Sequence, residues 1–286
     1  MLLLTSRLLL CLALSLGGMV SAARAASVWK VTAPGGGTLY LGGSVHALRS
    51  TDYPLPAAFN RAFDASARLV FEVDEKALAQ STRDMMKAAR YPKGDSLKNH
   101  VDPRTYDYVK RIFALMKVPE EKFSQYRPWF LVLMLQSPRG GFTQTLGVEQ
   151  FLLQRARANS KPVTGLESVR EHAEVFGGLS DRQGETLLLL TFIPGEKAGS
   201  GKDEIMTAWR RGDVDALAGI MYSSFREMPS FAERLLETRN RKWIPKIEGY
   251  LRSGKTYFVV VGAGHLGGRS GVLTLLREKG YEVSQL

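Results

Sequence analysis

Two short segments near opposite ends of the chain each run from a β-like stretch into the pattern Gly-x-x-His. The first is Gly43-Ser44-Val45-His46, and the second is Gly262-Ala263-Gly264-His265. A histidine just past a strand can project into a cleft, and two such strand ends can converge there. For a single Gly-x-x-His, a turn cap would be the simpler interpretation. Because the chain has 4 histidines and two of them repeat this context, the pattern favours a site on a sheet that joins both ends of the chain.

The first 25 residues have the features of a secretory signal. Arg7 supplies the positive start, residues 8–20 form the apolar stretch, and Ala23-Arg24-Ala25 is a small-x-small cleavage site. The apolar run is too short for a membrane span, which needs about 20 residues. Cys11, the single cysteine, lies inside it, so the processed chain would have no disulfide, thiolate chemistry or sulfur-bound zinc. We therefore expect an exported, periplasmic protein cleaved near Ala25.

Residues 26–286 are predicted to form a single domain, because no Pro/Ser/Gly-rich linker, repeat or low-complexity run divides them. The net charge of +11 would fall by two with the loss of Arg7 and Arg24. The basic residues are mixed with acidic ones, as in residues 233–248, so we expect a solvated surface and no nucleic-acid partner. We also expect no stable membrane anchor, and the sequence leaves the oligomeric state open.

The apolar patterns predict strands at both ends of the chain and helices between them. Strands are expected at residues 28–31, 38–42, 68–74, 161–166, 257–261 and 281–283, and helices at residues 57–66, 103–117, 119–135, 147–158, 168–176, 181–192, 203–222, 231–251 and 271–279. This order favours an α/β (α+β mixed) fold. Its central mixed sheet would join the N- and C-terminal strands, with a large helical insertion between them.

Three glutamates share the setting of the two motif histidines. Glu72 ends an apolar strand, Glu149 stands at a loop-to-helix junction, and Glu167 ends another strand. Two imidazoles and one or two carboxylates form a ligand set suited to zinc, manganese, cobalt or iron. Such a metal could lower the pKa of a bound water, with a spare glutamate as general base. The alternatives are structural, because the helix dipole alone favours Glu149 and the other two could pair with Arg or Lys.

Arg239 and Asn240 are further candidates for catalysis, because a guanidinium and an amide can orient a carboxylate or stabilise an oxyanion. The alternative is an exposed polar helix face, which the charged neighbours support. The remaining histidines, His100 and His172, are interpreted as surface residues. No His-Glu-x-x-His spacing is present to identify a metal, so it stays open which glutamate is base and which is ligand.

In their order along the chain, these motifs resemble the TraB/GumN family, which includes the Tiki proteases, over nearly all of the chain after residue 25. The motifs are Tyr40–His46, Tyr53–Pro56, Phe71–Asp74, Gly147–Glu149, Gly165–Glu167, Arg239-Asn240, Val261–Gly268 and the tail from Gly271 to Val283. The resemblance implies a metal-dependent, peptidase-like domain related to the haem-binding ChaN and erythromycin-esterase folds.

The resemblance also implies roles for individual residues. Tiki proteins are described as membrane-linked metalloproteases that use manganese or cobalt, with paired Gly-x-x-His motifs and a glutamate. Those roles would fall on His46, His265 and Glu72 as metal ligands, with Glu149 and Arg239 beside them. The chain departs from many members in having Ser44-Val45 where they carry Thr-Ile, and in showing no C-terminal membrane segment.

Three functions follow from these residues. The first is an exported metal-dependent hydrolase that holds a divalent transition metal (manganese, cobalt or zinc) and cleaves a peptide or small-molecule substrate. The second is a metal-independent esterase, in which His46 or His265 is the general base with a glutamate partner. The third is a non-catalytic periplasmic protein that binds a ligand or assists polysaccharide handling.

Overall fold

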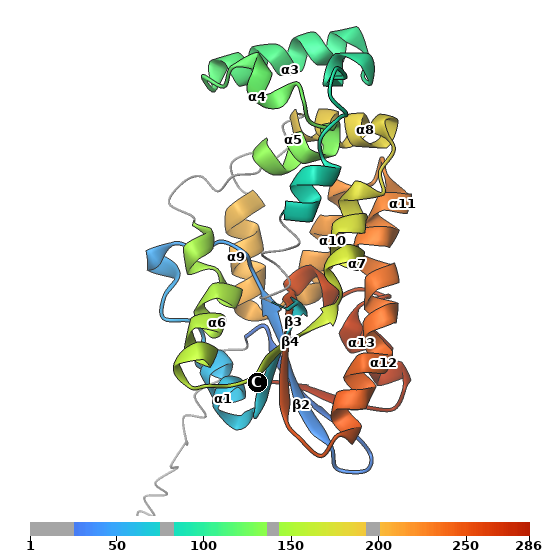
Figure 1. Ribbon diagram of the computed structural model, residues 1–286. Coiled ribbons are helices and arrows are strands. Elements are labelled where there is room, and N and C mark those ends of the chain that lie inside the picture. Colours follow the sequence, from blue (N-terminus) through green and yellow to red (C-terminus); the bar gives the residue numbers. More distant parts are fainter. Residues whose placement is uncertain (1–25, 75–82, 136–142, 193–200) are drawn as a thin grey trace, which may run out of the picture.

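The computed structural model describes residues 26–74, 83–135, 143–192 and 201–286, so the predicted signal segment lies outside the described residues (Figure 1). A six-stranded sheet has the order β4-β3-β5-β2-β1-β6. Its strands are β1 (Val28–Thr32), β2 (Thr38–Ser44), β3 (Arg68–Val73), β4 (Val163–Glu167), β5 (Tyr257–Gly262) and β6 (Glu282–Gln285). Strands β2 to β5 run parallel, whereas β1 is antiparallel to β2 and β6. The expected mixed sheet that joins both ends of the chain is confirmed.

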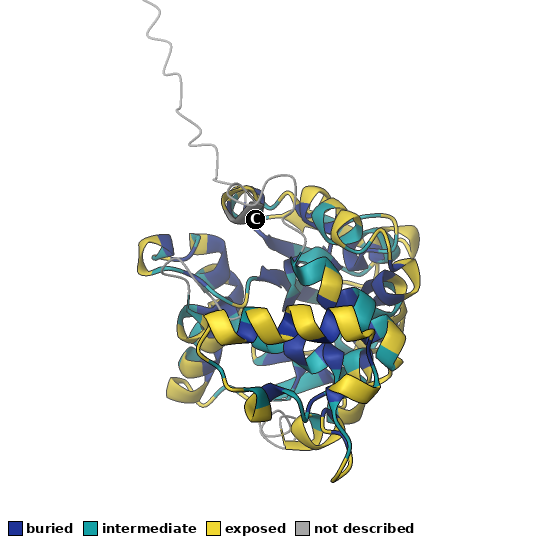
Figure 2. Cartoon of the chain, turned by 90° about the horizontal axis from the view of Figure 1, so that it is seen from above, coloured by how far each residue is buried: buried dark blue, intermediate teal, exposed yellow. Residues whose placement is uncertain are grey.

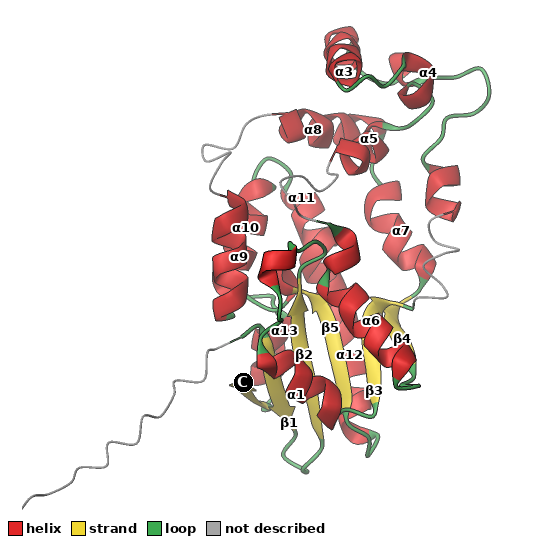
Figure 3. Cartoon of the chain, turned by 90° about the vertical axis from the view of Figure 1, so that its left-hand side faces the viewer, coloured by secondary structure: helices red, strands yellow, loops and turns green. Residues whose placement is uncertain are grey.

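Helices cover both faces of the sheet and form a further layer beyond its strand ends. They are α1 (Ala57–Ala65), α3 (Pro103–Leu115), α4 (Glu120–Phe123), α5 (Pro128–Leu135), α6 (Val148–Ala158), α7 (Val169–Gly177), α8 (Asp181–Phe192), α9 (Gly201–Arg211), α10 (Val214–Ser224), α11 (Pro229–Ala232), α12 (Thr238–Arg252) and α13 (Val272–Glu278). Helices α1 and α6 lie on one side of the sheet, and α12 and α13 on the other (Figure 1). The carboxyl ends of the parallel strands face the helical layer (Figure 3).

Two hydrophobic clusters hold these parts together. One surrounds the sheet and includes Leu41, Phe59 and Val259. The other fills the helical layer and includes Trp129 and Phe231. The outermost helix of that layer, α3, is exposed along its outer side (Figure 2). In the part of the chain that the structure describes, no helix combines the length and apolar character that a bilayer crossing requires.

Two of the predicted helices are each divided in the structure. The segment 119–135 breaks into α4 and α5, and α5 begins at Pro128, because proline cannot continue a preceding helix but suits a first turn. The segment 203–222 breaks at Gly212, whose φ of +68° ends α9. Asp213 then caps α10 with its side chain.

The predicted helix over residues 231–251 is extended and contains an irregular turn. Helix α11 runs into a π-turn at Glu233–Glu237, which leads directly into α12. A π-turn rotates the following residues relative to a regular α-helix, and such turns are frequent at functional sites. Here the turn stands two residues before Arg239.

Candidate active site

The parallel register brings the two Gly-x-x-His motifs side by side. Ser44 at the end of β2 pairs with Gly262 at the end of β5. Strand β3 flanks β5 on its other side, and the backbone N–H of Gly262 donates to Oε1 of Glu72 at 2.8 Å. Ligands in parallel α/β sheets bind beyond such carboxyl ends. The strand ends that carry the two motifs and Glu72 therefore lie at one end of the sheet.

Helix α12 adds Arg239 and Asn240 to this site from its buried face. The two residues are 7% and 1% exposed, so the alternative of an exposed polar face is wrong. Arg239 Nη1 also donates to the carbonyl of Leu235, inside the π-turn, at 3.2 Å. Its guanidinium lies 4.8 Å from the ring centre of Trp243, one turn further along α12.

His265 is held in one tautomer by its neighbours on α12. The amide nitrogen of Asn240 donates to the carbonyls of His265 and Ser270, at 3.1 and 2.8 Å, which leaves its oxygen as an acceptor. That oxygen lies 2.7 Å from Nδ1 of His265, so Nδ1 carries the proton. The lone pair of Nε2 then faces Arg239 Nη1 at 3.0 Å and Glu72 Oε1 at 3.9 Å.

The charge state of His265 follows from its surroundings. Burial lowers its pKa to about 4, although the Glu72 carboxylate works in the opposite direction, and the charge of Arg239 lowers it further. The imidazole is therefore neutral at neutral pH. A neutral ring with a fixed tautomer and its lone pair on Nε2 is the form in which histidine binds a metal.

Glu72 and Glu167 meet at the guanidinium of Arg239. Arg239 Nη2 lies 2.5 Å from Glu72 Oε2 and 2.5 Å from Glu167 Oε1, and Nε donates to Glu167 Oε2 at 3.1 Å. Burial alone would raise the pKa of both carboxyl groups, but the charge of Arg239 and hydrogen bonds hold both pKa values below the usual range. Both groups are therefore carboxylates that share one guanidinium.

His46 and Glu149 form a second pair at the same end of the sheet. His46 Nδ1 lies 2.8 Å from Glu149 Oε1, and Ser44 Oγ donates to the same oxygen at 2.6 Å. The Glu149 carboxylate raises the pKa of His46 to about 9, and the charge of Glu72 adds to the effect. The imidazole side chain is 73% exposed, so the pair presents a protonated ring to solvent. None of the described hydrogen bonds or ion pairs joins His46 to Glu72 or His265.

His172 and His100, interpreted from the sequence as surface residues, are partly exposed, and each is paired with at least one carboxylate. His172 Nδ1 lies 2.8 Å from Glu167 Oε1, and its side chain is 32% exposed. His100 lies between Asp95 and Asp181 in the helical layer, away from the strand ends. The sequence contained one signal for His172, which follows Glu167 by five positions in a short helix after a strand. Such a helix can bring residue 172 back over the strand end at Glu167.

The donor atoms at the strand ends fit a divalent transition metal. Glu72, Glu167 and His172 offer ligand atoms that all lie within 4.8 Å of one another. Nε2 of His265 lies 3.9 Å from Oε1 of Glu72, which is a member of this group. Asn240 fixes the orientation of the His265 ring, in the way that a hydrogen-bond partner orients a metal-bound histidine. Oxygen and imidazole donors suit zinc, manganese and cobalt.

Comparison with known proteins gives a family match over nearly the whole described chain. The model of the TraB/PrgY/gumN family matches residues 27–285. Metalloprotease TIKI2 of Danio rerio is 23% identical over 301 residues, which cover 85% of this chain and 57% of that protein. The uncharacterized protein YbaP of Escherichia coli (strain K12) is 25% identical over 250 residues, 86% of this chain and 90% of YbaP.

The relatives differ in length from this chain. Metalloprotease TIKI1 of Danio rerio is also 23% identical over 301 residues, with 60% of its length covered. The chain thus spans about three fifths of the length of these two metalloproteases. No solved structure matches the chain.

Proposed function

Because this chain belongs to the TraB/PrgY/gumN family, we propose that it is a metal-dependent hydrolase that cleaves peptide bonds. The observation that carries the proposal is the convergence of two oriented donor atoms from neighbouring strand ends. Nε2 of His265 and Oε1 of Glu72 lie 3.9 Å apart, a separation that one ion with bonds of about 2.0–2.2 Å could span. The similarity to metalloproteases of the TIKI group supports the same reaction class.

We assign the proposed ligands and catalytic residues as follows. His46, His265 and Glu72 would hold the metal, and Glu72, Glu149, Arg239 and Asn240 would support catalysis. A bound divalent ion would supply polarisation of a carbonyl group and a water of lowered pKa.

The chain's own side chains would prepare the site for that chemistry. Asn240 keeps the proton of His265 on Nδ1, and Glu149 keeps the His46 ring oriented through Nδ1. Before a metal binds, Arg239 holds the Glu72 carboxylate in place, and the backbone of Gly262 fixes the other oxygen of that carboxylate.

The location and the substrate class belong to the same proposal. The signal features of residues 1–25 support export to the periplasm. There the substrate would be a peptide or another small molecule rather than a nucleic acid, in keeping with the mixed distribution of charge.

One observation favours a second candidate function, a metal-independent esterase. The exposed His46 ring bonded to Glu149 has the arrangement of a histidine and its orienting carboxylate in acid–base catalysis. Ester hydrolysis that survives exhaustive chelation would favour this function. Tight ligand binding without turnover, unaffected by chelation, would instead favour a non-catalytic binding protein.

Metal content of the purified protein is the direct test. We expect about one transition-metal ion per chain by mass spectrometry, and loss of that ion in the folded double variant His46→Ala/His265→Ala. His100→Ala is the matched control, because it removes a histidine from the helical layer and should leave the metal content unchanged. Absence of metal after incubation with manganese, cobalt and zinc would contradict the metal-dependent function.

A further inference from the structure

The guanidinium of Arg239 lies among donor atoms of Glu72, Glu167 and His265 that could hold a metal. It contacts Oε2 of Glu72 at 2.5 Å and Nε2 of His265 at 3.0 Å, and it contacts both carboxylate oxygens of Glu167. Every nitrogen of a guanidinium is a donor. The contact with His265 uses the one lone pair through which that imidazole could bind a metal, and the contacts with Glu72 and Glu167 place a cation beside the oxygens that a metal ion would need.

We propose that Arg239 is a built-in competitor of the metal. Its guanidinium serves as the cation of this site in the metal-free protein, and metal loading displaces it. This inference rests on the proposed metal-dependent function. It concerns how the site exchanges one cation for another, and it assigns Arg239 a role beyond orienting Glu72.

Electrostatics makes joint occupancy by both cations unfavourable. The side chains of Glu72, Glu167 and Arg239 are 15%, 5% and 8% exposed, so water screens their charges weakly. Two carboxylates and one guanidinium leave one negative charge in this cluster. A divalent ion added beside the guanidinium would place two positive groups a few ångströms apart at low dielectric, where like charges repel strongly.

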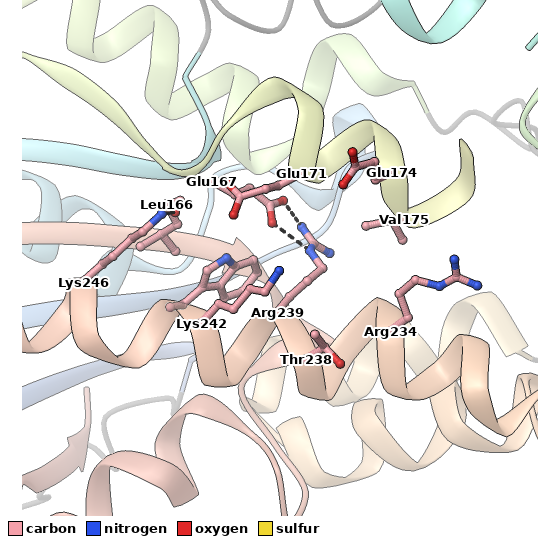
Figure 4. Close-up of a pocket in the computed structure, with 11 residues that line it drawn as sticks. Leu166, Glu167, Glu171, Glu174, Val175, Arg234, Thr238, Arg239, Lys242 and Lys246 are labelled. Atoms are coloured by element: carbon pink, nitrogen blue, oxygen red, sulfur yellow. Dashed lines mark hydrogen bonds and ion pairs between the residues drawn. The ribbon is translucent and has the colours of Figure 1, made fainter. Parts of the chain in front are cut away.

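The structure also offers space for the displaced side chain. A cavity of about 170 Å³ adjoins Arg239 between α7 and α12. Glu171 and Glu174 line its α7 side, and Arg239 points from α12 toward Glu167 at its inner edge (Figure 4). The guanidinium could therefore move toward other carboxylates without entering the apolar core.

Cobalt affinity of single-residue variants tests this inference. We expect Arg239→Gln to bind Co²⁺ at least tenfold more tightly than the wild-type protein in a calorimetric or absorbance titration, a difference of about 1.4 kcal/mol. Lys242→Gln is the matched control. Lys242 lines the same cavity and carries the same charge, but no described hydrogen bond or ion pair joins it to Glu72, Glu167 or His265. The Co²⁺ affinity of Lys242→Gln should therefore equal that of the wild-type protein.

A second variant covers the case in which Arg239→Gln does not fold, since it leaves two buried carboxylates without their cation. Arg239→Lys retains the charge but lacks the planar fork that contacts both glutamates at once. The shorter contact set of Arg239→Lys should compete less well with the metal, so this variant should bind Co²⁺ more tightly than the wild-type protein. Trp243 supplies a spectroscopic readout, because metal binding should move the guanidinium away from its ring and change the fluorescence of the wild-type protein.

The outcomes separate this inference from the proposed function. If the wild-type protein binds metal and the folded Arg239 variants bind it equally or more weakly, Arg239 assists the metal and the inference is overturned, while the metal-dependent function stands. If neither wild type nor a folded Arg239 variant binds Co²⁺, Mn²⁺ or Zn²⁺, both are overturned. Metal binding that appears only after Arg239 is replaced would be the strongest support for competition.

Discussion

The side-chain oxygen of Asn240 lies 2.7 Å from Nδ1 of His265 and decides which ring nitrogen faces the site. Both residues are nearly inaccessible, at 1% and 6% exposed. Because the Asn240 amide nitrogen is already bonded to two backbone carbonyls, the amide cannot turn over without losing both contacts. One side chain thus sets the tautomer of His265 and joins α12 to the loop after β5.

Replacement of Asn240 by alanine should therefore affect both stability and metal binding. The variant would leave the His265 N–H and two carbonyls without a partner, so the free energy of unfolding should fall by about 1–3 kcal/mol. Loss of a group that orients a metal-bound histidine typically costs about 10–100-fold in metal affinity. Chemical denaturation and a Co²⁺ titration measure the two effects. Asn99→Ala removes an exposed amide bonded to Asp95 and should change neither.

Replacement of Glu149 by glutamine should lower the pKa of His46 from about 9 toward its ordinary value near 6.5, because the Glu149 carboxylate is the main cause of the raised value. Because the pKa of His46 is higher in the folded than in the unfolded protein, protonation of His46 stabilises the folded state. This stabilisation is fully present below about pH 6.5 and is lost as the pH rises through about 9. The variant should lose this pH dependence. Nuclear magnetic resonance titration of the His46 ring would measure the pKa directly, and an unchanged pKa would contradict the pairing.

The two histidines outside the Gly-x-x-His motifs should respond differently to alanine. His100 bridges Asp95 and Asp181 at 2.7 and 2.8 Å and stacks on Tyr91, so His100→Ala should lower the free energy of unfolding by about 2 kcal/mol or more. His172→Ala removes a single contact with Glu167 and should cost about 1 kcal/mol. Denaturation curves rank the two variants, and a larger loss for His172→Ala would be inconsistent with these contacts.

Two glycine-to-alanine variants should have effects of opposite sign. A Cβ on Gly267, in the loop after His265, would lie 2.1 Å from the carbonyl oxygen of Val214. The backbone would have to shift, which should cost about 1–3 kcal/mol and move the loop that carries His265. A Cβ on Gly219, in α10, would meet nothing within 4 Å, so Gly219→Ala should stabilise the helix by about 0.5–1 kcal/mol. Thermal unfolding of both variants tests the contrast.

Much of the fold followed from local patterns in the sequence. Alternating or continuous apolar stretches marked the strands around Val28, Leu41 and Val259, because a strand shows its burial pattern within a few residues. The breaks at Pro128 and Gly212 carried local signals too, since proline and glycine restrict or permit backbone angles on their own. The paired strand ends also indicated that the two motif histidines belong at one end of the sheet.

The contacts within the site depend on the tertiary structure alone. The sequence placed Glu72, Glu149 and Glu167 at element ends, but it could not assign Glu149 to His46 and the other two to Arg239. The paired residues are separated along the sequence by between 72 and 167 positions. Their contacts depend on strand register, on the π-turn before α12 and on how deeply each helix packs. The sequence by itself determined which chemical groups stand at the strand ends, because that is local. Packing decided which groups touch and which histidine nitrogen faces the site, because burial and distance arise only when remote elements meet.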